Sequence, residues 1–128
     1  MNKVEEIAKS LWDAHTQKST IAPIREHIGE TDLDTAYAIQ RVNTERRVAN
    51  GEAIKGKKIG LTSFAVQEQL GVDQPDYGIL FDSMEVKDGK LAFSELVQPK
   101  AEAEIAFVLG EDLEGDFNIT DLIEAIDY

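Results

Sequence analysis

The sequence contains no cysteine among its 128 residues. This absence excludes a disulfide scaffold, a thiolate zinc site and a cysteine nucleophile. Proline is scarce as well, with three residues. The first residues, MNKVEEIAKSLWDAH, carry charges throughout, so they form neither a signal peptide nor a membrane-spanning helix. We therefore expect a cytoplasmic protein with no membrane partner.

Basic residues are few compared with acidic ones. Thirteen Lys and Arg stand against 25 Asp and Glu, which gives a formal net charge of −12. A protein that binds the nucleic-acid backbone needs the opposite sign, so we predict no nucleic-acid partner. Most of this charge serves solubility, but some of the carboxylates are candidates for holding a cation.

The apolar spacing predicts helices first and mostly strands afterwards, an order typical of the α+β class. Asn118 or Thr120 is expected to cap the last helix, and Glu45–Arg47 to lie on a solvated helix face. In the first predicted strand, 54–62, glycine is expected to permit a local irregularity. The predicted helices are 2–17, a second that Thr31 caps and Gly51 ends with a left-handed stop, a third at 63–70 that closes at Gly71, and one near the carboxyl end. The predicted strands are 54–62, 77–81 and 100–109.

The segment KAEAEIAFVL, residues 100–109, alternates strictly between two faces. As a strand it would place Glu102 and Glu104 on one face, about 7 Å apart. Two close carboxylates are costly unless they share a cation or a proton, and oxygen ligands favour Mg²⁺ or Mn²⁺. The pattern alone is weak, and it fits two exposed strand glutamates better than a metal site; both interpretations stay open at this point.

Two other motifs fail on inspection. The stretch GEAIKGKK at 51–58 lacks the Ser or Thr of a phosphate-binding loop and follows a predicted helix. Residues 112–123 lack the glycine and the closing glutamate of a calcium loop. His15 and His27 lie in the helical part, where packing or surface roles are the ordinary explanation.

Two longer stretches carry a family resemblance. KKIGLTSFAVQEQLGVDQPDYGILF at 57–81 and QPKAEAEIAFVL at 98–109 are similar to signature segments of the 2-keto-4-pentenoate hydratase family, within the fumarylacetoacetate-hydrolase-like superfamily. The resemblance implies amino-terminal helices (1–52) followed by the first part of a mixed, curved catalytic β-structure (53–128). Family members are about twice as long as this chain. The resemblance therefore covers only the amino-terminal half of a family member, and the rest of that structure is missing here.

The resemblance also assigns site residues. It implies that Glu102 and Glu104 are two of three carboxylate ligands for Mg²⁺ or Mn²⁺, with the third beyond Tyr128. It further places Lys58 and Asp76 in the active site as catalytic residues. Considered by residue type alone, Lys58 is a solvated lysine in a KGKK run and Asp76 is a turn aspartate.

The implied activity is a hydratase of aromatic-compound catabolism. It adds water to a small-molecule 2-hydroxy-2,4-dienoate, or 2-oxo-enoate, and yields a 4-hydroxy-2-oxo acid; a homo-oligomer is expected. One alternative is the related 2-oxo-3-enedioate (4-oxalocrotonate-type) decarboxylase, although an acid in QPDYG favours the hydratase. The other is a non-catalytic truncated fragment, because a chain without the third ligand is expected to be inactive alone.

Overall fold

The structure is a computed structural model that describes residues 2–128, and it divides into two units. The first unit ends at Val97 and holds the helices α1–α4 and both strands. The second unit, Gln98–Tyr128, holds the helix α5. The boundary that the family resemblance implies, between residues 52 and 53, falls inside the first unit and stays a prediction.

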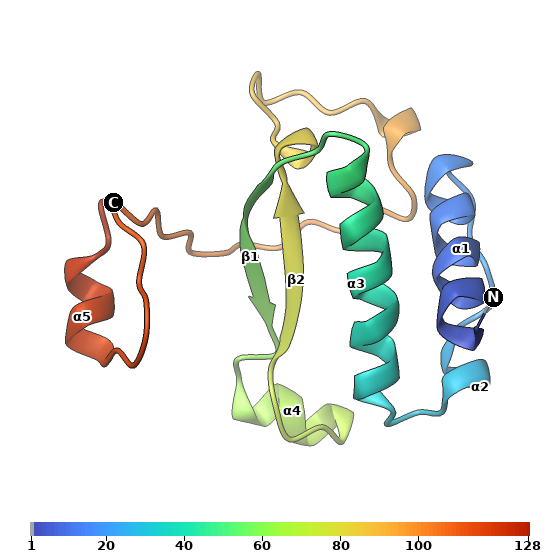
Figure 1. The fold of residues 1–128 in the computed structure, drawn as a ribbon, viewed down its shortest axis with the longest axis horizontal. Coiled ribbons are helices and arrows are strands. Elements are labelled where there is room, and N and C mark those ends of the chain that lie inside the picture. Colours follow the sequence, from blue (N-terminus) through green and yellow to red (C-terminus); the bar gives the residue numbers. More distant parts are fainter. Residues whose placement is uncertain (1) are drawn as a thin grey trace. The chain divides into compact units, whose positions relative to one another are not determined.

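Two long helices pack against each other in the first unit. Helix α1 (Lys3–Thr16) begins with a reciprocal cap, in which the Asn2 side chain accepts the Glu5 N–H and the Glu5 carboxylate accepts the Asn2 N–H, both at 3.0 Å. Helix α3 (Leu33–Ala49) lies beside it (Figure 1). The contact is close because Ala8 is small, and the Asn43 amide donates to its carbonyl at 2.9 Å.

The ends of α3 follow local chemistry. Its cap is Asp32, and the prediction that Thr31 caps it is wrong: the Asp32 carboxylate accepts the Thr35 N–H at 3.0 Å. That hydrogen bond lowers the pKa of Asp32. Gly51 follows the helix with a φ of 95°, so the predicted left-handed stop is confirmed. The short helix α2 (Arg25–Ile28), which the sequence did not predict, lies between α1 and α3.

An antiparallel pair of strands follows. Strand β1 (Ile54–Gly60) pairs with β2 (Asp76–Phe81), and a register shift between Ile54 and Gly56 confirms the predicted irregularity. Helix α4 (Phe64–Leu70) connects them and ends at Gly71 with a φ of 70°, as predicted. Short 3₁₀ helices follow at Asp82–Met84 and Phe93–Glu95.

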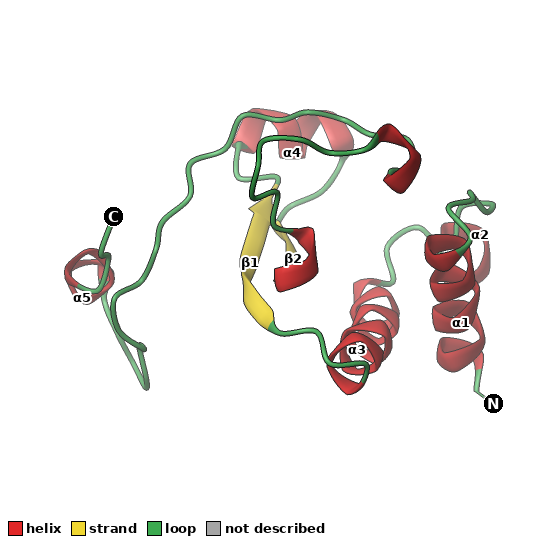
Figure 2. Ribbon diagram, turned by 90° about the horizontal axis from the view of Figure 1, so that it is seen from above, coloured by secondary structure: helices red, strands yellow, loops and turns green. Residues whose placement is uncertain are grey.

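Helix α3 runs along β2 on the side away from β1 (Figures 1 and 2). Two of its side chains bind the backbone of Tyr77 there. The Tyr77 N–H donates to the Tyr37 hydroxyl at 3.1 Å, and the Gln40 amide donates to the Tyr77 carbonyl at 3.0 Å. Helix α3 therefore supplies the hydrogen bonds that a third strand would otherwise make at this position.

The second unit contains one regular element, α5 (Ile119–Glu124). Asn118 caps it, with Asp121 completing a reciprocal cap, so one of the two predicted caps is confirmed. The predicted strand over 100–109 is wrong for this chain. Its backbone pairs only at its end, where Val108 bonds Tyr128 and Asp127 at 2.7 Å and Leu109 forms an isolated bridge with Ile126.

A strand needs a neighbouring strand to satisfy its backbone groups. Residues 101–107 have no strand partner within the described chain. Their apolar side chains also lack cover, since Ile105 is 83% and Phe107 65% exposed. The alternation that predicted a strand is therefore not matched by a neighbouring strand in the part of the chain that the structure describes.

Helices and a small antiparallel sheet confirm the predicted α+β class. The buried apolar side chains are few and mostly small: Ala8, Ala14, Ile39, Phe81 and Ala125. No helix in residues 2–128 is both long and apolar enough to cross a membrane.

Candidate functional site

The register of β1 and β2 brings two of the predicted site residues to one face. Lys58 is paired with Gly78, and Gly60 with Asp76. Directly paired residues share a face of an antiparallel sheet, and so do residues two apart on one strand. Lys58 and Asp76 are therefore diagonal neighbours on the same face of the hairpin, with Lys58 half-buried and Asp76 exposed.

The Asp76 carboxylate lies directly over Gly60. A Cβ atom built on Gly60 would meet Asp76 Oδ1 at 2.1 Å and Cγ at 3.1 Å. Two other glycines on this face, Gly56 and Gly78, have no atom within 4 Å of an equivalent Cβ. The missing side chain at residue 60 is thus what leaves room for the acid across the strand.

The two predicted metal ligands lie in the second unit. Glu102 and Glu104 are exposed, and they belong to the segment that forms no strand. Within residues 2–128 there is no group of three or more His, Asp or Glu placed to hold a metal ion. That Glu102 and Glu104 are ligands stays a prediction.

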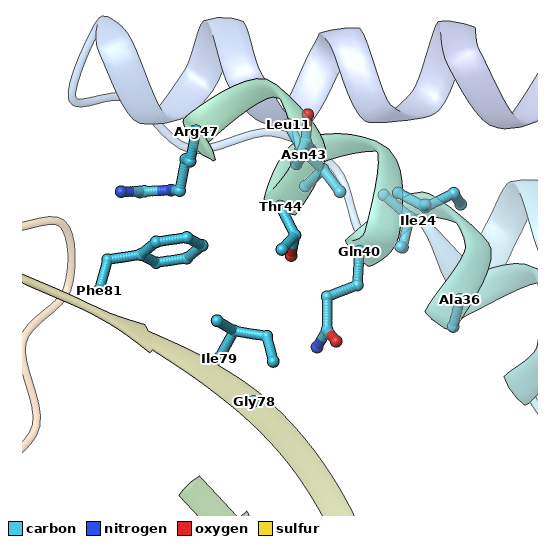
Figure 3. A pocket seen from close by; sticks show the side chains of 11 residues that line it. Leu11, Ile24, Ala36, Gln40, Asn43, Thr44, Arg47, Gly78, Ile79 and Phe81 are labelled. Carbon is cyan, nitrogen blue, oxygen red and sulfur yellow. The ribbon is translucent and has the colours of Figure 1, made fainter. Parts of the chain in front are cut away.

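A cavity of about 340 Å³ lies in the first unit, between α1, α3 and β2 (Figure 3). Its wall is largely apolar, and the longer polar side chains are already engaged. Gln40 binds the Tyr77 carbonyl, Asn43 binds the Ala8 carbonyl, and Arg47 binds Glu52. Its lining includes no histidine or carboxylate, so it is a gap between helix and sheet without acid–base groups.

Arg47 is the centre of a charged network beside this cavity. It forms an ion pair with Glu52 at 2.8 Å, in which the two side chains are 14% and 21% exposed. Its guanidinium also lies 4.9 Å from the centre of the Phe81 ring and 6.0 Å from that of Trp12. Figure 3 shows the Arg47 side chain beside the Phe81 ring. The Ser83 hydroxyl donates to Glu52 as well.

This network corrects the prediction that Glu45–Arg47 lies on a solvated face. Glu45 is exposed, but Arg46 and Arg47 are half-buried and both lie over Trp12. Arginine suits this position because its planar group stacks on rings while it keeps its charge. Sequence spacing alone could not show it, since the partner rings come from other elements.

His15 belongs to the same network. Its Nε2 atom lies 2.9 Å from an Arg47 Nη atom, and because arginine only donates, Nε2 accepts. Partial burial lowers the pKa of His15, the positive charges of Arg47 and Lys18 lower it further, and Glu52 acts in the opposite direction. His15 is exposed, and its contact with Arg47 fits the predicted surface or packing role. His27 is exposed and lines a separate hollow beside α1.

Known proteins similar to this chain are named as hydratases. The TodF product hydratase of Pseudomonas putida is 51% identical over 127 residues, covering 98% of this chain and 47% of that protein. A 2-keto-4-pentenoate hydratase of Paraburkholderia phymatum is 53% identical over 129 positions, covering 99% and 49%. Along nearly its whole length the chain is therefore similar to proteins named as hydratases of this type. It spans about half the length of the curated relatives it matches.

Solved structures extend the 2-keto-4-pentenoate hydratase comparison to the fold. The 4-oxalocrotonate decarboxylase of Pseudomonas putida G7, complexed with magnesium and adipate, matches with a TM-score of 0.88 and 37% identity. The match covers 98% of this chain and 49% of that one. A structure of the same enzyme with calcium and acetate gives the same TM-score. A comparison with models of protein families gave no match.

Proposed function

We propose that the complete protein is a hydratase that adds water to a 2-hydroxy-2,4-dienoate formed during breakdown of aromatic compounds. The main support is the near-50% identity to proteins named 2-keto-4-pentenoate hydratase along almost the whole chain. The shared face of Lys58 and Asp76 adds to it. Each supplies a group that the chemistry needs.

The reaction moves protons and adds one water. The dienol loses its O2 proton and gains one at C5, which gives the 2-oxo-3-enoate; water then delivers hydroxyl to C4 and a proton to C3. We propose that Lys58 transfers the proton during tautomerisation, because a lysine ammonium can donate and its amine can accept. Asp76, diagonal to it, would orient the water and accept a proton from it.

Glu102 and Glu104 are the proposed metal ligands of this chain. Two carboxylates offer the hard oxygen donors that Mg²⁺ prefers, and Mn²⁺ accepts the same donors. When bound, the metal would polarise the 2-oxo group as a Lewis acid. A third acidic ligand is predicted beyond Tyr128, so we expect residues 1–128 alone to bind metal weakly and to be inactive.

One observation favours a second candidate function. The structural neighbour with the TM-score of 0.88 is a decarboxylase of 4-oxalocrotonate, a reaction that releases CO₂ and needs no acid to handle water. Asp76 is the residue that separates the two. In a hydratase its replacement by Ala should abolish hydration, whereas a decarboxylase should keep most of its CO₂ release.

The test uses the complete gene product that contains these residues, with residues 1–128 in parallel. We expect Mg²⁺-dependent loss of the dienoate absorbance of 2-hydroxypenta-2,4-dienoate and no CO₂ from 2-oxohex-3-enedioate. Glu104→Gln should lower the rate by about 10²-fold or more, whereas Glu111→Gln, an exposed control in the same unit, should not. Hydration that is undiminished in Glu104→Gln would refute the ligand assignment, and CO₂ release without hydration would favour the decarboxylase.

A further inference from the structure

Gly60 differs from the other glycines of the β1–β2 hairpin in one respect. A Cβ there would lie 2.1 Å from the Asp76 carboxylate, well inside van der Waals contact. Its φ lies outside the left-handed region, so the backbone itself accepts other residues. Glycine is needed at this position because a larger residue would collide with the side chain that lies over it.

The side chain in that space is the one with a proposed role. Asp76 is paired with Gly60 across the strands, and its carboxylate lies toward β1, the strand that also carries Lys58. A methyl group at residue 60 would force Asp76 into another rotamer, because the three atoms nearest to it all belong to the end of this flexible side chain. The strand pair would remain.

We infer that Gly60 is a positioning residue, which leaves room for the Asp76 carboxylate to lie across β1 on the face that Lys58 shares. This inference rests on the proposed function, since it concerns the orientation of the proposed water-handling acid. It adds a residue that acts through Asp76 and does not itself touch substrate. A displacement of the carboxylate by about 1 Å is enough to lower turnover by roughly 10²-fold.

The experiment compares Gly60→Ala with Gly56→Ala in the complete gene product. Gly56 lies on the same face of β1, but it has no atom within 4 Å of an equivalent Cβ. Three-bond carbon couplings measured by NMR report the χ1 rotamer of Asp76 without any reference to activity. We expect Gly60→Ala to change that rotamer and to lower kcat by about 10²-fold with little change in KM, and Gly56→Ala to change neither.

A double-variant cycle separates the contact from a general effect on folding. In an Asp76→Ala background the carboxylate is gone, so adding Gly60→Ala should cause no further loss of kcat. If Gly60→Ala fails to fold, the double variant should fold, because the obstruction has been removed. A double variant that is less active or less folded than Asp76→Ala alone overturns the inference.

The outcomes also distinguish this inference from the proposed function. Suppose the complete gene product without substitutions is active. If Gly60→Ala then leaves either the Asp76 rotamer or kcat unchanged, the positioning role is overturned. An inactive parent counts against the proposed function, and against a catalytic consequence of the contact. In that case the coupling measurement still decides whether Gly60 sets the orientation of Asp76.

Discussion

The ion pair of Arg47 with Glu52 should contribute far more to stability than the exposed pairs of this chain. We consider Arg47→Met, which keeps an apolar stem of similar length and removes the charge. Glu52, whose side chain is 21% exposed, then loses its cationic partner. Removing one member of a buried pair costs about 3–5 kcal/mol, and the remaining exposure of this pair reduces that value.

The ring contacts add to the effect. The guanidinium lies 4.9 Å from the centre of the Phe81 ring, and a partly desolvated cation over a ring contributes about 0.5–2 kcal/mol. We therefore expect Arg47→Met to lower the free energy of unfolding by about 2–4 kcal/mol. The matched control is Lys9→Met, because Lys9 pairs with Asp13 while 56% and 42% of their side chains stay exposed. It should cost no more than about 0.5 kcal/mol.

Urea unfolding followed by tryptophan fluorescence measures both variants. Trp12 is the sole tryptophan and lies beneath Arg46 and Arg47, so it reports on the unit in question. With a slope of about 2 kcal/mol per molar urea, Arg47→Met should shift the midpoint by roughly 1–2 M. The double variant Arg47→Met/Glu52→Met should regain part of the loss, because no buried charge is left unpaired. Equal midpoints for Arg47→Met and Lys9→Met would refute this reasoning.

Two further predictions concern pH and capping. Because the pKa of His15 is lowered in the folded state, the unfolded state binds more protons below pH 6.5, so the free energy of unfolding should fall as pH drops from 6.5 toward the folded pKa. His15→Gln should flatten that part of a urea-midpoint profile; an unchanged slope would contradict it. Asn118→Ala should destabilise α5 by about 1 kcal/mol, seen as faster hydrogen exchange of amides 119–124 while those of α1 are unchanged.

Much of the fold was predictable because its signals are local. Asn118 begins a helix through hydrogen bonds to amides within three residues of it. Gly51 and Gly71 each end a helix through a positive φ. Such local signals are visible in the sequence. Asp32 caps α3 in place of the predicted Thr31, because both residue types suit a cap and only the geometry decides between them. The strands of the hairpin were predicted for the same reason, since they are close in sequence and joined by a short helix.

What sequence reasoning missed depends on distant partners. Residues 101–107 have the pattern of a strand, but a pattern cannot supply the neighbour to which a strand must bond. The sequence likewise predicts a surface position for Arg47, because the rings of Trp12 and Phe81 that it contacts belong to other elements of the fold. At the candidate site, Lys58 and Asp76 share a face because of the register in which β1 pairs with β2. A shift of that register by one residue would separate the two side chains. The contact of Asp76 with Gly60 depends on interatomic distances that a sequence does not give. Its only sequence signal is a glycine within a strand.

The bonds from Tyr37 and Gln40 to Tyr77 have a consequence for how the β-structure can grow. Both outward backbone groups of Tyr77 are occupied by α3, so a new strand is blocked from pairing with β2 there. Within the described residues β1 pairs with β2 alone, which leaves its outer edge as the place for addition. At Tyr77, α3 therefore closes the outer edge of β2, and the outer edge of β1 is the side at which a further strand can be added.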